Sequence, residues 1–258
     1  MSRVTLTHDG RVALVELRDP PANFFDRDKL AAIADAGEQA SAEGARAIVL
    51  ASEGKHFCAG ASLAPTGSVD GDSASDPRAA AAAVYEQAVR IFRLDLPVVA
   101  AVQGAAVGGG LGLACAADFR VAGPTTRFEA NFARLGFHCG FALSVSLPRI
   151  VGESAAARML LTGLRVNAEE ALAIGLADRL ADAGEERTVA LALAADLAAA
   201  APLAVQSMRR TLRAGLLSGI EAALEHELDE QERLWQTEDA ALGITASLER
   251  RAPVFLGR

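Results

Sequence analysis

Two glycine-containing segments, each following an apolar run, constrain this chain more than any other feature of its sequence. Residues 55–63 (KHFCAGASL) follow the run at 47–50, and residues 101–114 (AVQGAAVGGGLGLA) continue the run at 97–102. A short apolar run bounded by turn residues is typical of a buried strand. Small residues let backbone N–H groups approach a ligand closely, and two such groups form an oxyanion hole. The pair therefore indicates chemistry on an acyl group.

Strand and helix signals alternate over the first 122 residues and predict an α/β fold with a parallel sheet. An edge hairpin turns at Asp9-Gly10. We expect helices at 28–43, 78–92 and up to residue 116, and strands at 47–50, 98–102 and 119–122. Beyond Arg149 we expect helices at 154–161, 168–174, 185–200, 202–216 and 220–236, and one strand at 177–180. We divide the chain into a core at 1–195 and a helical oligomerisation region at 196–258.

Composition narrows the class of protein. The net charge of −8 over 258 residues gives no support for nucleic-acid binding. No apolar stretch approaches the ~18 residues of a membrane span, so we expect a cytoplasmic protein. The three cysteines (Cys58, Cys115 and Cys139) show no Cys-x-x-Cys spacing, which favours reduced thiols. The four histidines lack metal-ligand spacing, so we predict no metal.

Five short motifs occur in a fixed order along the chain. They are Arg18 with Asn23, the run 57–63 (FCAGASL), the run 104–113 (GAAVGGGLGL), Asp118-Phe119-Arg120, and Pro253-Val254-Phe255. With these motifs the whole chain resembles the crotonase superfamily, the enoyl-CoA hydratase/isomerase family. The resemblance implies a crotonase-like ββα spiral core and an acyl-CoA thioester substrate. It also implies no cofactor other than the coenzyme A of that substrate, and a homotrimer or a dimer of trimers.

The resemblance assigns the binding residues. It places the oxyanion-hole donors at the N–H groups of Ala61 and Gly109, the second at the start of a helix whose dipole favours negative charge. It places the coenzyme A contacts at the early loop, the first glycine segment and the C-terminal tail: Pro20, Ala22, Phe24, Ala59, Ala61, Ser62, Leu63 and Phe255, with Arg250 and Arg251. Ser62 stands where the family usually has aspartate.

The catalytic acids of the hydratases are missing. The resemblance places their two glutamates at Gly112 and Phe132, and neither residue can transfer a proton. The candidate replacements are His138, whose ordinary pKa suits proton transfer near neutrality, and Glu129. Cys139 is a weaker candidate, as a nucleophile, because no separate base is evident.

Apolar residues at both acid positions predict a dry acyl pocket, lined by Phe132, Phe137, Phe141 and Leu111. Such a pocket favours isomerase-type or other enolate chemistry over simple hydration. The alternative is a non-catalytic acyl-CoA-binding protein of the same fold.

Overall fold

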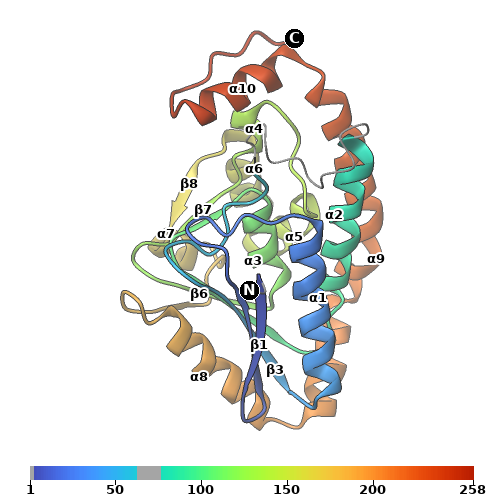
Figure 1. Ribbon diagram of the computed structural model, residues 1–258, viewed down its shortest axis with the longest axis vertical. Helices are drawn as coiled ribbons and strands as arrows, with labels where there is room; N and C mark the ends of the chain where they lie inside the picture. The colour runs from blue at the N-terminus through green and yellow to red at the C-terminus, as the bar shows by residue number, and fades with distance from the viewer. Residues whose placement is uncertain (1–2, 63–76) are drawn as a thin grey trace.

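The main sheet has six strands in the order β1-β2-β3-β4-β6-β9. The computed structural model describes residues 3–62 and 77–258 (Figure 1). The predicted hairpin is confirmed as β1 (Val4–Asp9) and β2 (Val12–Leu17), which pair antiparallel. The parallel strands β3 (Ala47–Ser52), β4 (Val98–Val102), β6 (Phe119–Ala122) and β9 (Arg179–Leu180) continue the sheet from β2.

Helices cover both faces of this sheet, because alternate residues of a strand point to opposite faces. On β3, Ile48 and Leu50 join the core formed with α1 (Arg27–Ala42) and α2 (Pro77–Phe92). Val49 and Ala51 instead pack against α8 (Glu186–Ala199). A strand buried on both faces is apolar throughout, which explains the uninterrupted run at 47–51.

A second, three-stranded sheet was not predicted. It consists of β5 (Ala105–Val107), β7 (Arg127–Glu129) and β8 (Arg165–Asn167), in that order. Single bridges extend it in the other direction: Cys58 pairs with Ala106, and Phe25 pairs with Ala61. The result is a ladder that runs from the early loop through the first glycine segment, β5 and β7 to β8. Below, this set of paired segments is called the small ladder.

The remaining helices begin at the second glycine segment, and the last two of them form the C-terminal part of the chain. They are α3 (Gly109–Ala116), α4 (Phe132–Leu135), α5 (Leu143–Val151), α6 (Glu153–Thr162), α7 (Ala168–Ala173), α9 (Pro202–Trp235) and α10 (Glu238–Leu248). The prediction of a break between 216 and 220 was wrong, because α9 continues through Gly219. Leu216 and Ile220 are both buried there, and their packing outweighs the cost of about 1 kcal/mol for a helical glycine. The division at residue 195 stays a prediction.

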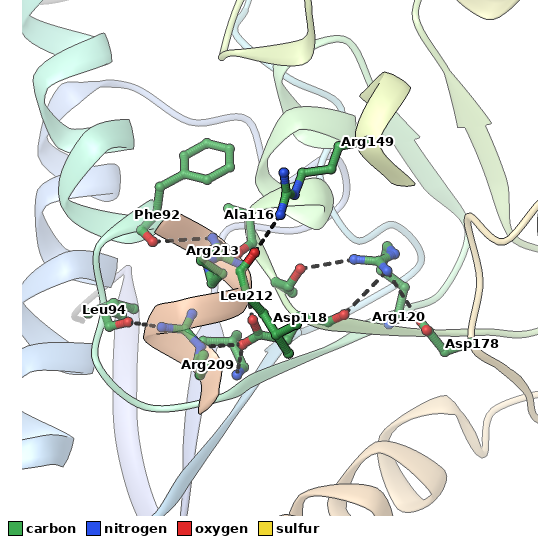
Figure 2. A network of polar contacts seen from close by, with 12 residues as sticks. Phe92, Leu94, Ala116, Asp118, Arg120, Arg149, Asp178, Arg209, Leu212 and Arg213 are labelled. Carbon is green, nitrogen blue, oxygen red and sulfur yellow. Dashed lines mark hydrogen bonds and ion pairs between the residues drawn. The ribbon is translucent and has the colours of Figure 1, made fainter. Parts of the chain in front are cut away.

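Ion pairs of buried arginines join α9 and β9 to the core (Figure 2). The Asp118 carboxylate accepts from Arg209 Nε at 2.7 Å and from Arg213 Nη1 at 3.0 Å. Arg120 pairs with Asp178 at 3.0 Å, next to β9. The Asp-x-Arg motif is therefore structural, since its two charged residues anchor α9 and β9.

Among residues 3–62 and 77–258, no single helix is both long and apolar enough to cross a membrane. Taken together, α8 and α9 meet such a test of length and composition, but they are bent by 109° relative to each other.

Candidate active site

The early loop is fastened to the first glycine segment by Asn23. This side chain is fully buried, and its Nδ2 donates to the carbonyls of Glu53 (2.9 Å) and His56 (2.7 Å). Its Oδ1 accepts from the N–H of Asp19 at 3.0 Å. One amide therefore fixes two chain segments that lie 30 residues apart or more.

Lys29 of α1 holds the same loop from beneath. Its buried ammonium donates to Asp19 Oδ2 at 2.6 Å and to the carbonyl of Phe24. The hydrogen bond from Lys29 lowers the pKa of Asp19. Between these anchors, Pro20 and Phe24 are exposed and Ala22 is half-buried, so a ligand can reach the predicted coenzyme A contacts.

Backbone hydrogen bonds fix the position of the first glycine segment within the small ladder. Ala59 N–H donates to the carbonyl of Ala22 (3.0 Å), and the Gly60 carbonyl accepts from Phe25 (3.0 Å). On the other side, Cys58 N–H donates to the carbonyl of Ala105 at 3.0 Å. These bonds fix the backbone immediately before Ala61 without using its N–H.

The second glycine segment passes directly beside the first. Gly108 has a φ of +56°, and its N–H donates to the carbonyl of Glu129 at 2.8 Å. A Cβ at Gly60 would lie 2.9 Å from the carbonyl of Val107 and 3.5 Å from Gly109 N, so a larger residue would push the segments apart.

The two predicted donors remain available. Within the described residues, the N–H groups of Ala61 and Gly109 have no acceptor, and Gly109 is the first residue of α3. Ala61 is exposed and Gly109 is half-buried, so both lie at a surface that a ligand can reach. Two free N–H groups and a helix N-terminus together favour an oxygen that gains negative charge.

Aromatic rings pack against the first turn of α3, at Gly109 and Gly112. A Cβ at Gly109 would collide with the ring of Phe25, and one at Gly112 would lie 2.6 Å from Phe141 Cβ. The Phe141 ring also packs against Phe25 and Phe92, with centroids 5.5 and 6.3 Å away. The space into which a side chain at residue 112 would extend is therefore filled.

The backbone that carries Phe141 is strained and is held from α9. Phe141 and Ala142 have φ values of +61° and +55°, in the left-handed region that most residues avoid. The buried carboxylate of Glu227 accepts from the N–H groups of Ala142 (2.8 Å) and Ser144 (2.9 Å). Burial raises the pKa of Glu227. Glu227 therefore fixes the turn that places Phe141 beside Gly112.

The second acid position also carries an aromatic ring. Phe132 is buried, and its ring would lie 3.8 Å from a Cβ at Gly108. Phe137 packs edge-on against Phe132 and against Trp235, with centroids 6.1 and 6.2 Å away. Leu111 lies in the core and is fully buried. Three phenylalanines thus border the second glycine segment: Phe25, Phe132 and Phe141.

The candidate proton-transfer residues have other neighbours. The His138 ring packs edge-on against His226 of α9, and its Nδ1 lies 2.8 Å from the carbonyl of Cys139. Burial raises the pKa of the Cys139 thiol to about 12, which opposes a thiolate nucleophile at neutral pH. Glu129 lies on β7 rather than on a helix, and its carboxylate pairs with Arg165 at 3.1 Å. The catalytic roles of His138 and Glu129 stay predictions.

Two cavities lie on either side of α4. One of about 450 Å³ is lined by Phe255 and Phe137, next to the tail. Asp239 holds this tail by accepting from the N–H groups of Leu256 (2.6 Å) and Gly257 (2.8 Å). The other cavity, of about 630 Å³, is lined by residues that include Arg250 and Arg251.

The predicted contact Leu63 lies outside the described residues, and Ser62 is half-buried. No group of three or more potential metal ligands occurs in the part of the chain that the structure describes. Three residues that shape the site were not predicted from the sequence: Phe25, Lys29 and Glu227. Nothing in the sequence marks them, because their partners come from distant segments.

A family model described as enoyl-CoA hydratase/isomerase matches residues 7–258. A probable enoyl-CoA hydratase of Mycobacterium tuberculosis is 41% identical over 228 residues, or 87% of each chain. The (E)-benzylidenesuccinyl-CoA hydratase of Thauera aromatica is 33% identical and covers 98% of this chain, with 99% of its own length matched. A crystal structure of an enoyl-CoA hydratase/isomerase from Pseudoalteromonas atlantica superimposes with a TM-score of 0.86 at 27% identity, covering 99% of this chain and 100% of that one. These likenesses confirm the predicted crotonase-like fold.

Proposed function

Since the chain belongs to the enoyl-CoA hydratase/isomerase family of acyl-CoA-processing enzymes, we propose that it catalyses an isomerase-type or other enolate reaction of an acyl-CoA thioester. The enzyme stabilises the thioester enolate that forms in this reaction. In this proposal the N–H groups of Ala61 and Gly109 bind the thioester oxygen. The observation that carries the proposal is that both N–H groups lack an acceptor in the described part of the chain, while their surroundings are fixed by backbone hydrogen bonds. Donors held in place before the reaction stabilise developing charge without reorganisation.

The coenzyme A portion is proposed to lie along the early loop and the first glycine segment. The exposed side chains of Pro20 and Phe24 lie there on the loop that Asn23 and Lys29 hold in place. The proposal needs no cofactor beyond the coenzyme of the substrate. We also propose that the protein is cytoplasmic and that it forms a homotrimer or a dimer of trimers.

Simple hydration by two glutamates is disfavoured by the residues at the two acid positions. At Gly112 there is no carboxylate, and Phe141 fills the space that one would need. At Phe132 an apolar ring lies beside Gly108. A dry site without these acids disfavours positioning a water molecule, although two of the similar proteins above are named as a hydratase or a probable hydratase. His138 and Glu129 remain the proposed groups for proton transfer.

Two variants at Gly109 distinguish the effect of losing its N–H from the effect of adding a side chain there. Gly109→Pro removes the N–H, and the first position of a helix tolerates proline. Gly109→Ala adds a similar contact with Phe25 but keeps the N–H, which makes it the matched control. Enolate formation is measured as exchange of the acyl Cα proton for deuterium in D₂O, alongside hydration and double-bond isomerisation of a panel of enoyl-CoA thioesters.

We expect Gly109→Pro to lose about 10²–10³-fold more activity than Gly109→Ala, the usual effect of removing one oxyanion donor. Equal activity of the two variants would contradict the role of this N–H group. Hydration without exchange or isomerisation would contradict the preferred reaction. Binding without any turnover, unchanged in His138→Ala and Glu129→Ala, would favour the acyl-CoA-binding alternative.

A further inference from the structure

A cleft of about 630 Å³ between α4, the start of β8 and the end of α10 is strongly basic. Four guanidinium groups line it, those of Arg134, Arg165, Arg250 and Arg251, and we call it the arginine cleft. Glu129 is the one acidic residue among the described residues that line it. The lining is therefore net positive in a protein whose net charge is −8. Such a local excess of positive charge attracts an anionic group.

Most of the hydrogen-bond donors in this cleft are not used by the protein. Arg134, Arg165 and Arg251 each donate through Nε to a carbonyl or a carboxylate. Their Nη groups, and the whole guanidinium of Arg250, have no acceptor among residues 3–62 and 77–258. Each guanidinium presents five N–H donors in a plane that matches the two oxygens of a carboxylate.

The small ladder places the arginine cleft on the acyl side of the site. Along this ladder the early loop lies at one end, the segment of Ala61 follows, then β5, which leads into Gly109, and β7 and β8 lie at the other end. Asn131 lines the cleft, and its Oδ1 would lie 3.1 Å from a Cβ at Gly108. Two strand spacings, roughly 10 Å, separate Ala61 from β7, whose Glu129 lines the cleft. The cleft thus begins at β7, on the side of the donors away from the early loop.

We propose that the arginine cleft binds the distal carboxylate of a dicarboxylic acyl-CoA. The inference rests on the proposed function, because the thioester oxygen must be bound by Ala61 and Gly109 for the far end of the acyl group to reach the cleft. It adds a substrate class that the donors alone do not specify. The acyl chain spans the phenylalanine-lined region, and its terminal carboxylate receives N–H bonds from the arginines.

The test compares matched pairs of thioesters by titration calorimetry on the full chain. Each dicarboxylic compound (succinyl-, adipyl- and sebacyl-CoA) is paired with the monocarboxylic compound of equal length (butyryl-, hexanoyl- and decanoyl-CoA). The cleft variants are Arg134→Gln and Arg250→Gln. The matched control is Arg210→Gln, because Arg210 is an exposed arginine on α9 outside the lining of the cleft. Circular dichroism verifies that each variant is folded.

We expect the longer dicarboxylic compounds to bind about tenfold more tightly than their partners, the effect of one or two charge-assisted hydrogen bonds. This preference disappears in the two cleft variants, persists in Arg210→Gln and weakens with added salt. Equal binding of the two series, or a preference that survives both cleft variants, overturns the inference and leaves the proposed function intact.

The same titrations with 3′-dephospho-CoA thioesters separate the acyl carboxylate from the phosphate of the coenzyme. If the effect of the cleft variants disappears with these compounds, the arginines bind the coenzyme and the inference is overturned. If none of the thioesters binds, the inference and the proposed function both fail.

Discussion

Gly112→Ala should be destabilising for a reason that can be tested atom by atom. The added Cβ would lie 2.6 Å from Phe141 Cβ and 2.8 Å from its Cγ. Carbon atoms pack best at ~3.5–4.0 Å, so the overlap is about 1 Å. Overpacking of this kind costs about 1–3 kcal/mol. Alanine in place of a helical glycine increases the free energy of unfolding by about 0.5–1 kcal/mol, which offsets only part of that cost.

Two backgrounds at residue 141 identify the atom that clashes. Phe141→Ala removes the ring but keeps the Cβ, so Gly112→Ala should remain destabilising in that background. Phe141→Gly removes the Cβ as well, and glycine tolerates the φ of +61° found there. In that background Gly112→Ala should become stabilising by about 0.5–1 kcal/mol, because only the helix effect remains.

The assay is reversible unfolding in urea, monitored by the circular dichroism of all six proteins in the two cycles. Coupling between residues 112 and 141 should be about 1–3 kcal/mol when residue 141 becomes glycine, and much smaller when it becomes alanine. The reasoning would be refuted if Gly112→Ala had the same effect in the wild-type and Phe141→Gly backgrounds.

Three further changes test the contacts around this site. Glu227→Gln should flatten the pH dependence of stability, because burial raises the folded pKa of Glu227 above 4.5. The contribution of protonated Glu227 to stability is complete below that pH and is lost as the pH rises through the folded pKa. The difference in Tm between wild type and variant should therefore narrow from pH 4 to pH 8. Asp118→Ala should cost about 3–5 kcal/mol in urea unfolding, because it leaves two buried guanidinium groups without a counter-charge, and the more exposed Asp178→Ala should cost clearly less. Lys29→Met should reduce the free energy of acyl-CoA binding, measured by calorimetry, more than the free energy of unfolding, because it frees the early loop at Phe24. Equal losses in the two free energies would argue against this.

The parts of the fold that were predictable are those whose signal is local. The hairpin at Asp9-Gly10 and the apolar run that forms β3 follow from turn chemistry and burial. The second sheet was not predictable, because its strands have three residues each and show no periodicity. The continuous α9 was missed since Gly219 indicates a break, and only tertiary packing overrides that signal.

At the candidate site, the close approach of the two glycine segments was easier to predict than the side chains around them. The glycines needed for the close approach of Gly60 and Gly109 are visible in the sequence. Phe141 was expected in the pocket, but its contact with Gly112 depends on a left-handed turn that is held by Glu227, 86 positions later. Such a contact is specified by the tertiary fold and leaves no trace in the local pattern.

The small ladder has a consequence for how such a site evolves. The chain segments around Ala61 and Gly109 are positioned by main-chain hydrogen bonds, which do not depend on the identity of the side chains. Substitutions of the side chains around these segments, such as those at residues 112 and 132, can therefore change the groups that contact a substrate without moving the N–H groups of Ala61 and Gly109.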